Sequence, residues 1–477
     1  MEEIIFIFLC VFLPMILGSV SLIFRKARYS IALVVSFTTA VLATIIIARN
    51  LTIHHTFEGS FGVEVLVDRV SGFFMLTNAL VTLGTVLFMR EKHRKTFPEI
   101  LYPLVIFLHA TVNASFISYD LFNIYVVVEL TTIIAFILMG LGLAPRQTWG
   151  AIKYLMVGNT GMIFYLLGCI NLYQRTGSFS IGVIEPSMKL PIVLIVAGLA
   201  VKAAIFLFGT WLPDAHAEAE TPVSALLSGV VIYTGIFPLI RLYSTLPNIQ
   251  PLLEILGSMG AIFGAVCATL ERDTKRLLAF STLSHTGAIL AAPPYSLGFM
   301  MAHGLFKSWL FLHAGNLKTR NMDRLREEGI HVNDYIPLFI GTLGMMAAPG
   351  LGGFVGKLEL LNNSYGLVKM LLISTAVCTA TYSFSLISIP VKRQTRFEGF
   401  KTYDILYIVS LLLLGIKPMV YTLPNLTESM ILMFAGYLVY SLMKPIKSRF
   451  HNFFEDLDNI LTIAIVLVVL MMVGVLL

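Results

Sequence analysis

The sequence has 477 residues, of which 57% are hydrophobic and only 13% are charged. In a water-soluble protein about a quarter of the residues are charged, so this composition excludes a soluble globular fold and predicts a protein that lies mostly in a bilayer. The net charge is +6, but Lys and Arg fall in short loops, so they indicate membrane topology and no nucleic-acid partner.

Hydrophobic segments follow one another along the whole chain and predict an all-α polytopic membrane protein. A spanning helix needs roughly 20 apolar residues. Two segments are short and the one at 335–361 is long and interrupted, so we expect about 14–16 transmembrane helices. The sixteen segments are 4–24, 30–48, 70–89, 99–118, 121–143, 151–173, 191–212, 222–246, 251–270, 277–292, 296–317, 335–361, 367–391, 405–422, 429–443 and 459–477.

The first segment follows Glu2 and Glu3 without a basic region, which favours a true transmembrane helix over a cleaved signal peptide. Four cysteines each fall inside a hydrophobic run, and none has the spacing of a metal ligand. We therefore expect no disulfide framework, no metal site and no cofactor in this chain.

The loops that follow odd-numbered segments are basic. They include residues 25–28, 90–95, 272–276, 318–326 and 444–449, whereas even-numbered loops hold only scattered Lys and Arg. By the positive-inside rule, the basic loops lie in the cytoplasm and the N-terminus lies outside. The predicted location is the cell (inner or cytoplasmic) membrane, with multiple passes.

Several ionisable residues stand near the centres of predicted helices. A charge at that depth costs about 2.5–3.5 kcal/mol on insertion scales, so it must face protein or water. A single lysine near a helix end could snorkel to the interface, but a group of near-central charges predicts an ion pathway. The candidates are Glu129, Lys202, His285, His303, Lys307 and Lys357.

Two of the predicted helices are interrupted. Pro213 follows Lys202, and Pro349 with several glycines precedes Lys357. Broken helices at membrane depth commonly line ion sites. The two lysines are separated by 155 residues, and the segments that begin at 99 and 251 by a similar interval. The spacing predicts two inverted five-helix repeats, which are expected at 99–246 and 251–391, between N-terminal helices (1–98) and C-terminal helices (392–477).

Four motifs make the chain resemble a known family. They are Asp120-Leu-Phe-Asn-Ile-Tyr with Glu129, Lys202 with Trp211-Leu-Pro-Asp-Ala-His216 and Thr221-Pro-Val-Ser, Asp273-Thr-Lys-Arg with His285-Thr-Gly, and the run from His303 to Phe311. In this order they resemble the antiporter-like subunits shared by respiratory complex I, Mrp-type sodium/proton antiporters and membrane-bound hydrogenases.

The resemblance implies roles for the buried groups. Glu129 and Lys202 match the family's interacting pair in the first half-channel, His303 and Lys307 match its central relay, and Lys357 matches its terminal lysine. His285 suits the relay because its intrinsic pKa lies near neutrality. No residue is expected to be catalytic, so redox chemistry would belong to partner subunits, including further antiporter-like subunits.

The sequence also departs from the family pattern. The family usually has a lysine in the helix after the first broken one, and here Tyr233 stands at that position. Phe299 replaces a frequent histidine, and Glu220 replaces a frequent proline. A tyrosine can pass a proton along hydrogen bonds but cannot store a positive charge, so full pumping is left open.

Three functions therefore remain open. The chain is expected to translocate protons, or sodium, as a subunit of a redox-driven complex related to complex I or membrane-bound hydrogenase. It could instead belong to a stand-alone Mrp-type sodium/proton antiporter. The third alternative is a largely structural subunit with an impaired channel, which the change at Tyr233 favours.

Overall fold

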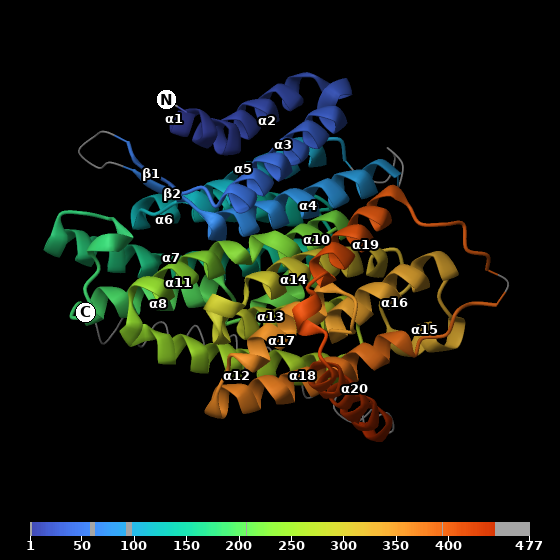
Figure 1. Cartoon of the computed structure of the whole chain (residues 1–477). Helices are drawn as coiled ribbons and strands as arrows, with labels where there is room; N and C mark the ends of the chain where they lie inside the picture. The colour runs from blue at the N-terminus through green and yellow to red at the C-terminus, as the bar shows by residue number, and fades with distance from the viewer. Residues whose placement is uncertain (1, 58–62, 92–97, 207, 394, 444–477) are drawn as a thin grey trace.

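The computed structural model describes residues 2–57, 63–91, 98–206, 208–393 and 395–443. Long helices run side by side, and the loops gather at the two ends of the bundle (Figure 1). Within the described residues, nine helices are long and apolar enough to cross a membrane. The all-α polytopic prediction is confirmed, because the only described strands form one short antiparallel hairpin.

The N-terminal part supplies three membrane helices, and the hairpin joins the second to the third. In chain order its elements are α1 (Glu2–Ile7), a π-helical turn (Phe8–Phe12), α2 (Leu13–Ile23), a 3₁₀ turn (Arg25–Ala27), α3 (Arg28–Arg49), β1 (Ile53–Thr56), β2 (Glu64–Val67) and α4 (Arg69–Glu91). The hairpin was not predicted, since its strands are only four residues long.

Two series of helices fill the centre of the bundle. The first contains α5 (Leu101–Ile117), α6 (Leu121–Gly140), α7 (Pro145–Thr176), α8 (Lys189–Lys202), α9 (Trp211–Glu218), α10 (Thr221–Leu226), a π-helical segment (Leu227–Val231) and α11 (Tyr233–Thr245). The second contains α12 (Gln250–Leu270), α13 (Thr274–Ala291), α14 (Leu297–Ala314), α15 (Met322–Glu328), α16 (Val332–Met346), α17 (Gly352–Asn362) and α18 (Gly366–Ile387).

The C-terminal part adds α19 (Thr402–Gly415) and α20 (Leu423–Met443), and 3₁₀ turns occupy 181–183, 247–249, 293–295 and 418–420. Fifteen of the sixteen predicted segments thus coincide with a helix or a broken helix pair. The segment predicted at 459–477 lies outside the described residues.

The two ends of the bundle differ in charge. The loops before α13, α15 and α19 meet at one end, where Asp273 pairs with Asn321 and Ile330 with Val391. We call this end the basic face. The β1–β2 hairpin lies at the other end (Figure 1). Two of the predicted basic loops, 272–276 and 318–326, thus share this end, whereas residues 92–97 and 444–477 lie outside the described residues.

Both predicted helix breaks are present. The first separates α8 from α9, and the second separates α16 from α17. Each break contains an alanine in the left-handed conformation, Ala204 with φ 51° and Ala347 with φ 64°. This conformation costs an L-residue roughly 1–2 kcal/mol. Such strain persists where the surrounding packing fixes the backbone, which is common at functional sites.

Capping residues further relate the two series. Asp120 caps α6 by accepting from Asn123 N, and Asp273 caps α13 by accepting from Lys275 N and Arg276 N. Each aspartate also forms an isolated bridge with the loop after the next-but-one helix, to Ser180 and to Asn321 respectively. The two caps thus have the same arrangement, while the five-helix repeat stays a prediction.

The two lysines of the broken helices do not occupy corresponding positions. Lys202 precedes the left-handed Ala204 by two residues, whereas Lys357 lies ten residues after Ala347, inside α17. The residue two positions before Ala347 is Met345. The equal spacing from which Lys202 and Lys357 were paired therefore does not reflect equivalent places in the two breaks.

Candidate functional site

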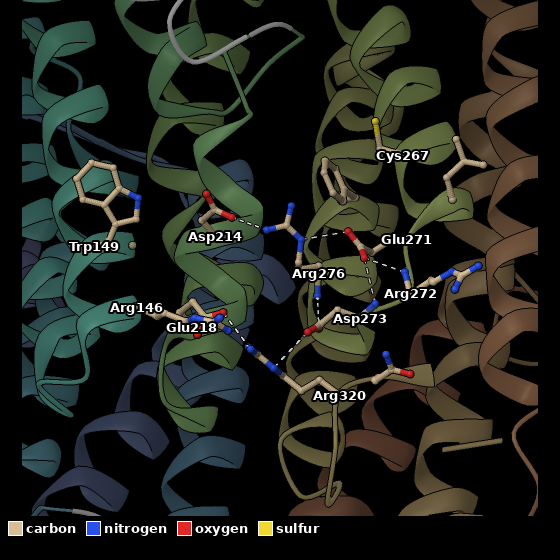
Figure 2. Close-up of a pocket in the computed structure, with 14 residues that line it drawn as sticks. Arg146, Trp149, Asp214, Glu218, Cys267, Glu271, Arg272, Asp273, Arg276 and Arg320 are labelled. Carbon is tan, nitrogen blue, oxygen red and sulfur yellow. Dashed lines mark hydrogen bonds and ion pairs between the residues drawn. The ribbon is translucent and has the colours of Figure 1, made fainter. Parts of the chain in front are cut away.

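A polar cavity opens on the basic face between the two helix series. Its volume is about 390 Å³. Figure 2 shows that arginines and carboxylates from α9, α13 and the adjoining loops point toward one another there. The charged lining residues are Arg146, Asp214, Glu218, Glu271, Arg272, Asp273, Arg276 and Arg320. We call this cavity the basin.

The acidic groups of the basin are all paired. Arg276 bonds Asp214 at 2.5 Å and Glu271 at 3.1 Å, and Arg320 bonds Glu218 at 3.0 Å and Asp273 at 3.2 Å (Figure 2). Burial raises the pKa of Asp273, and the nearby Arg320 opposes that rise. Because each carboxylate of the basin is paired with an arginine, the charges of its lining are largely balanced.

The basin leads to the first buried lysine. Asp214 also accepts from Lys153 Nζ at 2.5 Å, and Lys153 is largely buried on α7. The next residue, Tyr154, is uncharged, and its hydroxyl accepts a hydrogen bond from Lys202 Nζ at 2.9 Å. Adjacent residues of one helix therefore connect the basin wall to Lys202.

Lys202 is held by hydroxyl groups. It is 3% exposed, and its ammonium group donates to Thr132 Oγ1 at 2.5 Å and to Tyr154 OH at 2.9 Å. The ammonium also lies 4.6 Å from the centre of the Tyr154 ring, a cation–π contact. These contacts solvate a buried cation without fixing it to a permanent counter-ion.

Glu129 lies on the same helix as Thr132, one turn earlier, but forms no direct ion pair with Lys202. Its Oε2 accepts from the Asn159 amide nitrogen at 3.2 Å, when that amide is oriented to satisfy its neighbours. Its other oxygen, Oε1, is buried without a protein hydrogen-bond partner. Glu129 and Lys202 thus lie near enough for their charges to interact, without a direct bond between them.

Tyr233 is the first residue of α11, which packs against α8, the helix that ends at Lys202. It is fully buried, its hydroxyl donates to Met300 O at 2.8 Å, and the same hydroxyl lies 2.5 Å from His303 Nδ1. The helix of Tyr233 also approaches the break closely, since a Cβ at Gly235 would lie 2.5 Å from Ala203 N. Glycine is needed there, because any Cβ would collide with the backbone at the end of α8.

The central group is concentrated on α13 and α14. Lys307 is fully buried; its ammonium donates to Ser281 Oγ and, at 3.1 Å, to Leu278 O, and lies 3.6 Å from Met345 Sδ. His285 and His303 contact each other edge to face, with ring centres 5.3 Å apart. The structure therefore brings these three predicted residues together.

Tyr382 extends this group to α18. Its hydroxyl lies 3.3 Å from His285 Nε2 and 3.3 Å from Thr379 Oγ1. One nitrogen of each histidine, His285 Nδ1 and His303 Nε2, is buried without a protein partner. Buried polar atoms of this kind are rare in native proteins and mark places where water or a transferred proton is accommodated.

Lys357 lies at the far end of the line. Its ammonium donates to Met345 O at 3.3 Å, so one methionine contacts both Lys307 and Lys357. Two residues further along α17, Glu359 forms an ion pair with the exposed Lys417. That end of α17 packs near the 3₁₀ turn after α13, which is opposite to the basic face.

Sequence reasoning missed the residues that hold the lysines. Thr132, Tyr154, Ser281, Met345 and Tyr382 carry no charge, and their spacing within a hydrophobic helix is ordinary. His216 was noticed only as part of a motif; it is 2% exposed, and its Nδ1 has no protein partner. A pattern of hydroxyl residues facing the charged helices would have been the only signal.

Fold and site together define a class: a polytopic helical membrane protein with a line of buried titratable side chains that crosses two broken helices. A family model described as NADH:quinone oxidoreductase/Mrp antiporter, TM, matches residues 118–383, more than half of the chain. The chain belongs to this family. The resemblance seen in its motifs is thereby confirmed.

Curated relatives agree with this assignment. NADH-quinone oxidoreductase subunit N of Desulforudis audaxviator is 28% identical over 363 residues, which is 69% of this chain and 72% of the relative. NAD(P)H-quinone oxidoreductase chain 4 3 of a Picosynechococcus species is 32% identical over 330 residues. That match covers 63% of this chain and 60% of the relative, so the chain spans less than two thirds of this relative's length.

Solved structures share the fold over nearly the whole chain. One chain of the membrane-bound sulfane sulfur reductase, an archaeal respiratory membrane complex, gives a TM-score of 0.78 at 20% identity, covering 92% of this chain and 99% of that one. A chain of the Mrp complex from a Dietzia species gives 0.76 at 17% identity, covering 93% and 98%. At these identities the likeness establishes the fold alone.

Proposed function

We propose that this chain translocates protons across the membrane as an antiporter-like subunit of a multi-subunit, redox-driven complex. The single observation that carries the proposal is the line of buried titratable groups from the basin to Lys357. Its members are Lys202, Tyr233, His303, Lys307 and Lys357, and each lies beside a polar neighbour.

The residue types favour protons over sodium. Sodium is a hard cation that needs several oxygen ligands, as hard metal cations in general do. The centre of the line is instead made of lysines and histidines, which repel a metal cation when charged and can hold and release a proton. Sodium exchange by a partner subunit of the same complex is compatible with this role.

The structural alternative is less well supported by the contacts of Tyr233. If the channel had decayed there, its side chain would be free to turn away from the relay. Its hydroxyl instead hydrogen-bonds His303 directly. A stand-alone antiporter, without a redox partner, differs in its driving force rather than in this chain, and the relatives named as quinone oxidoreductase subunits favour the redox-driven complex.

Partners and cofactors follow from the same proposal. Relatives are subunits of larger membrane assemblies, so we propose that this chain packs against further membrane subunits and that the redox centres reside in those partners. Purification of the complex from its native membrane, followed by mass spectrometry of its subunits, tests this. If the purified complex exchanges ions but contains no redox subunit, the chain belongs to a stand-alone antiporter and the proposed redox-driven complex is wrong.

Orientation is part of the proposal. We place the basic face in the cytoplasm of the cell membrane and the N-terminus outside, because cytoplasmic loops carry the excess of Lys and Arg. A cysteine introduced at Arg324, on the exposed α15, is expected to react with an impermeant thiol reagent only after the membrane is opened. Labelling in intact cells would reverse the assignment.

The test of transport uses the purified complex in vesicles with an internal pH dye. Wild-type complex is expected to acidify or alkalinise the vesicles on addition of its electron donor and acceptor. In complex with Lys307→Ala, proton movement through this subunit is expected to stop, so that fewer protons move per electron or both rates fall together. Unchanged proton movement per electron would refute the proposal.

A further inference from the structure

A second, much narrower cavity lies at the basic face; its lining shares no residue with the basin, although its Thr274 directly follows the basin's Asp273. It is enclosed by α13, α14, α16 and α18. Its lining includes Thr274, Leu278, Ala314, Tyr335, Thr342 and Leu386. The space open to the centre of a water molecule is about 10 Å³, whereas one water needs about 10–15 Å³. The cavity is therefore a constriction with room for one water molecule at most.

Two hydroxyl groups in this lining have no protein partner. Thr274 is 1% exposed and Thr342 is 0% exposed, and the Oγ1 atom of each is unpaired. Other buried threonines nearby bond their own helix; Thr282 Oγ1, for instance, donates to Leu278 O at 2.9 Å. A buried hydroxyl without a partner costs about 1–3 kcal/mol, so two of them in one narrow cavity favour water as the missing partner.

Both hydroxyls lead toward the ammonium group of Lys307. On α13, Thr274 stands one turn before Leu278, whose carbonyl accepts from Lys307 Nζ at 3.1 Å. On α16, Thr342 stands three residues before Met345, whose Sδ lies 3.6 Å from the same atom. Each of the two cavity threonines thus lies about one helical turn from a residue that contacts Lys307.

The first series of helices lacks both hydroxyls. The residue that follows the capping Asp120 is Leu121, where Thr274 follows Asp273. The residue five positions before the left-handed Ala204 is Leu199, where Thr342 stands five before Ala347. Leu121 and Leu199 are both fully buried. The polar pair is therefore specific to the second series and is not imposed by the fold.

We propose that this cavity is a separate water access from the basic face to Lys307, independent of Lys202 and Tyr233. The inference rests on the proposed function, because it gives Lys307 a source of protons. Thr274 and Thr342 hold a single transient water molecule, and the apolar walls close the cavity between transfers. A proton can then reach the central lysine although Tyr233 cannot store a charge.

The direct test removes the hydroxyls without removing volume. Thr342→Val and the double variant Thr274→Val/Thr342→Val are compared with Thr269→Val, whose hydroxyl bonds Ala265 O at 2.8 Å in a buried place outside the cavity. The complex is assayed in vesicles as assembled. We expect the double variant to slow proton movement about fivefold or more, which corresponds to roughly 1 kcal/mol, and the Thr269 variant to match wild type.

The Tyr233→Phe background shows whether the route is independent. If Lys307 is supplied by two routes, the loss caused by the threonine double variant is expected to be larger in that background than in wild type. If all protons arrive through Tyr233, the threonine changes are expected to have no effect in either background, and the inference is overturned. An equal loss with Thr269→Val would overturn it too, because the effect would then be general.

Water access is measured separately with silver ions. Complex with Thr342→Cys, with wild type as reference for the native cysteines, is exposed to Ag⁺ from the basic face. Faster loss of transport than in wild type and in Thr269→Cys supports access to the cavity, and equal rates contradict it. Normal pumping by the Lys307→Ala variant would instead contradict the proposed function. Failure of the water-access inference and failure of the proposed function are therefore distinguishable.

Discussion

The two lysine sites solve the problem of a buried cation in different ways. Lys202 lies near a carboxylate, Glu129, and a 390 Å³ basin of paired charges leads toward it. Lys307 has neither: among the described residues no carboxylate bonds to it, and its partners are a hydroxyl, a carbonyl and a thioether. The first site therefore has a carboxylate and a charged cavity near its lysine, whereas the described contacts of the second lysine are all uncharged.

The difference extends to the helix breaks. Lys202 stands two residues before a left-handed alanine, and the matching position of the second break holds Met345. Met345 contacts the two lysines of the second site at once, by its sulfur and its carbonyl. Two ammonium groups that share one residue repel each other strongly at low dielectric, so protons in the second site titrate as a coupled set rather than one by one.

The largest effect is expected from removing a lysine. Lys202→Ala and Lys307→Ala should each lower proton movement more than about tenfold, or 1.4 kcal/mol in the barrier, because each change removes one proton-carrying member of the line and leaves a gap in it. Assembly should persist, since a small apolar residue replaces a buried cation. The measurement is proton uptake per electron in vesicles, with subunit content checked by mass spectrometry. Full pumping by either variant would remove that lysine from the pathway.

Replacing the carboxylate near Lys202, Glu129, is expected to have the next largest effect on transport. Glu129→Gln keeps the shape and the contact with Asn159 but removes the charge that stabilises the Lys202 ammonium. We expect transport to fall by about tenfold, and Glu129→Ala to be at least as severe. Glu254→Gln is the matched control, because that carboxylate bonds Tyr243 outside the line. If both glutamine variants behave alike, Glu129 has no special part in the first site.

Tyr233 joins the two sites and has a smaller expected effect. Tyr233→Phe removes one hydrogen bond to His303, which is worth about 1 kcal/mol, so transport should fall several-fold but not vanish. Tyr233→Lys should preserve or raise it, since an ammonium can both donate to His303 and store a proton. Phe237→Tyr, one turn away, tests whether any polar change on that helix matters. Unchanged rates in both Tyr233 variants would exclude this residue from the relay.

Sequence reasoning predicted the fold better than the contacts. The lengths of the apolar segments predicted the helices. The prolines and glycines near Lys202 and Lys357 predicted both helix breaks, because these residues act on the local backbone. The contacts of Lys202 depend on α6 and α7 packing against α8, and neither Thr132 nor Tyr154 differs in sequence from any other hydroxyl residue in a membrane helix. The 155-residue spacing suggested that Lys202 and Lys357 are equivalent positions. They are not, because α7 is much longer than α14, which changes the residue offset between the two helix series.

The smallest effect concerns the two capping aspartates. Asp273 accepts two backbone N–H groups and pairs with Arg320, while Asp120 accepts one N–H group at 2.7 Å and pairs with no cation among the described residues. Loss of an N-cap costs about 0.5–2 kcal/mol.

We therefore expect Asp273→Ala to lower the thermal stability of the assembled complex more than Asp120→Ala does. Burial raises the pKa of Asp273, which means that the folded state binds its proton more tightly than the unfolded state. Acidification through that pKa should then favour the folded wild type relative to Asp273→Asn, which has no proton to bind. Melting curves of the complex at two acidic pH values and at neutral pH measure both effects. Equal melting temperatures for the two alanine variants would show that Arg320 and the second N–H group add nothing to the cap, and the basin would then contribute to transport without contributing to the stability of α13.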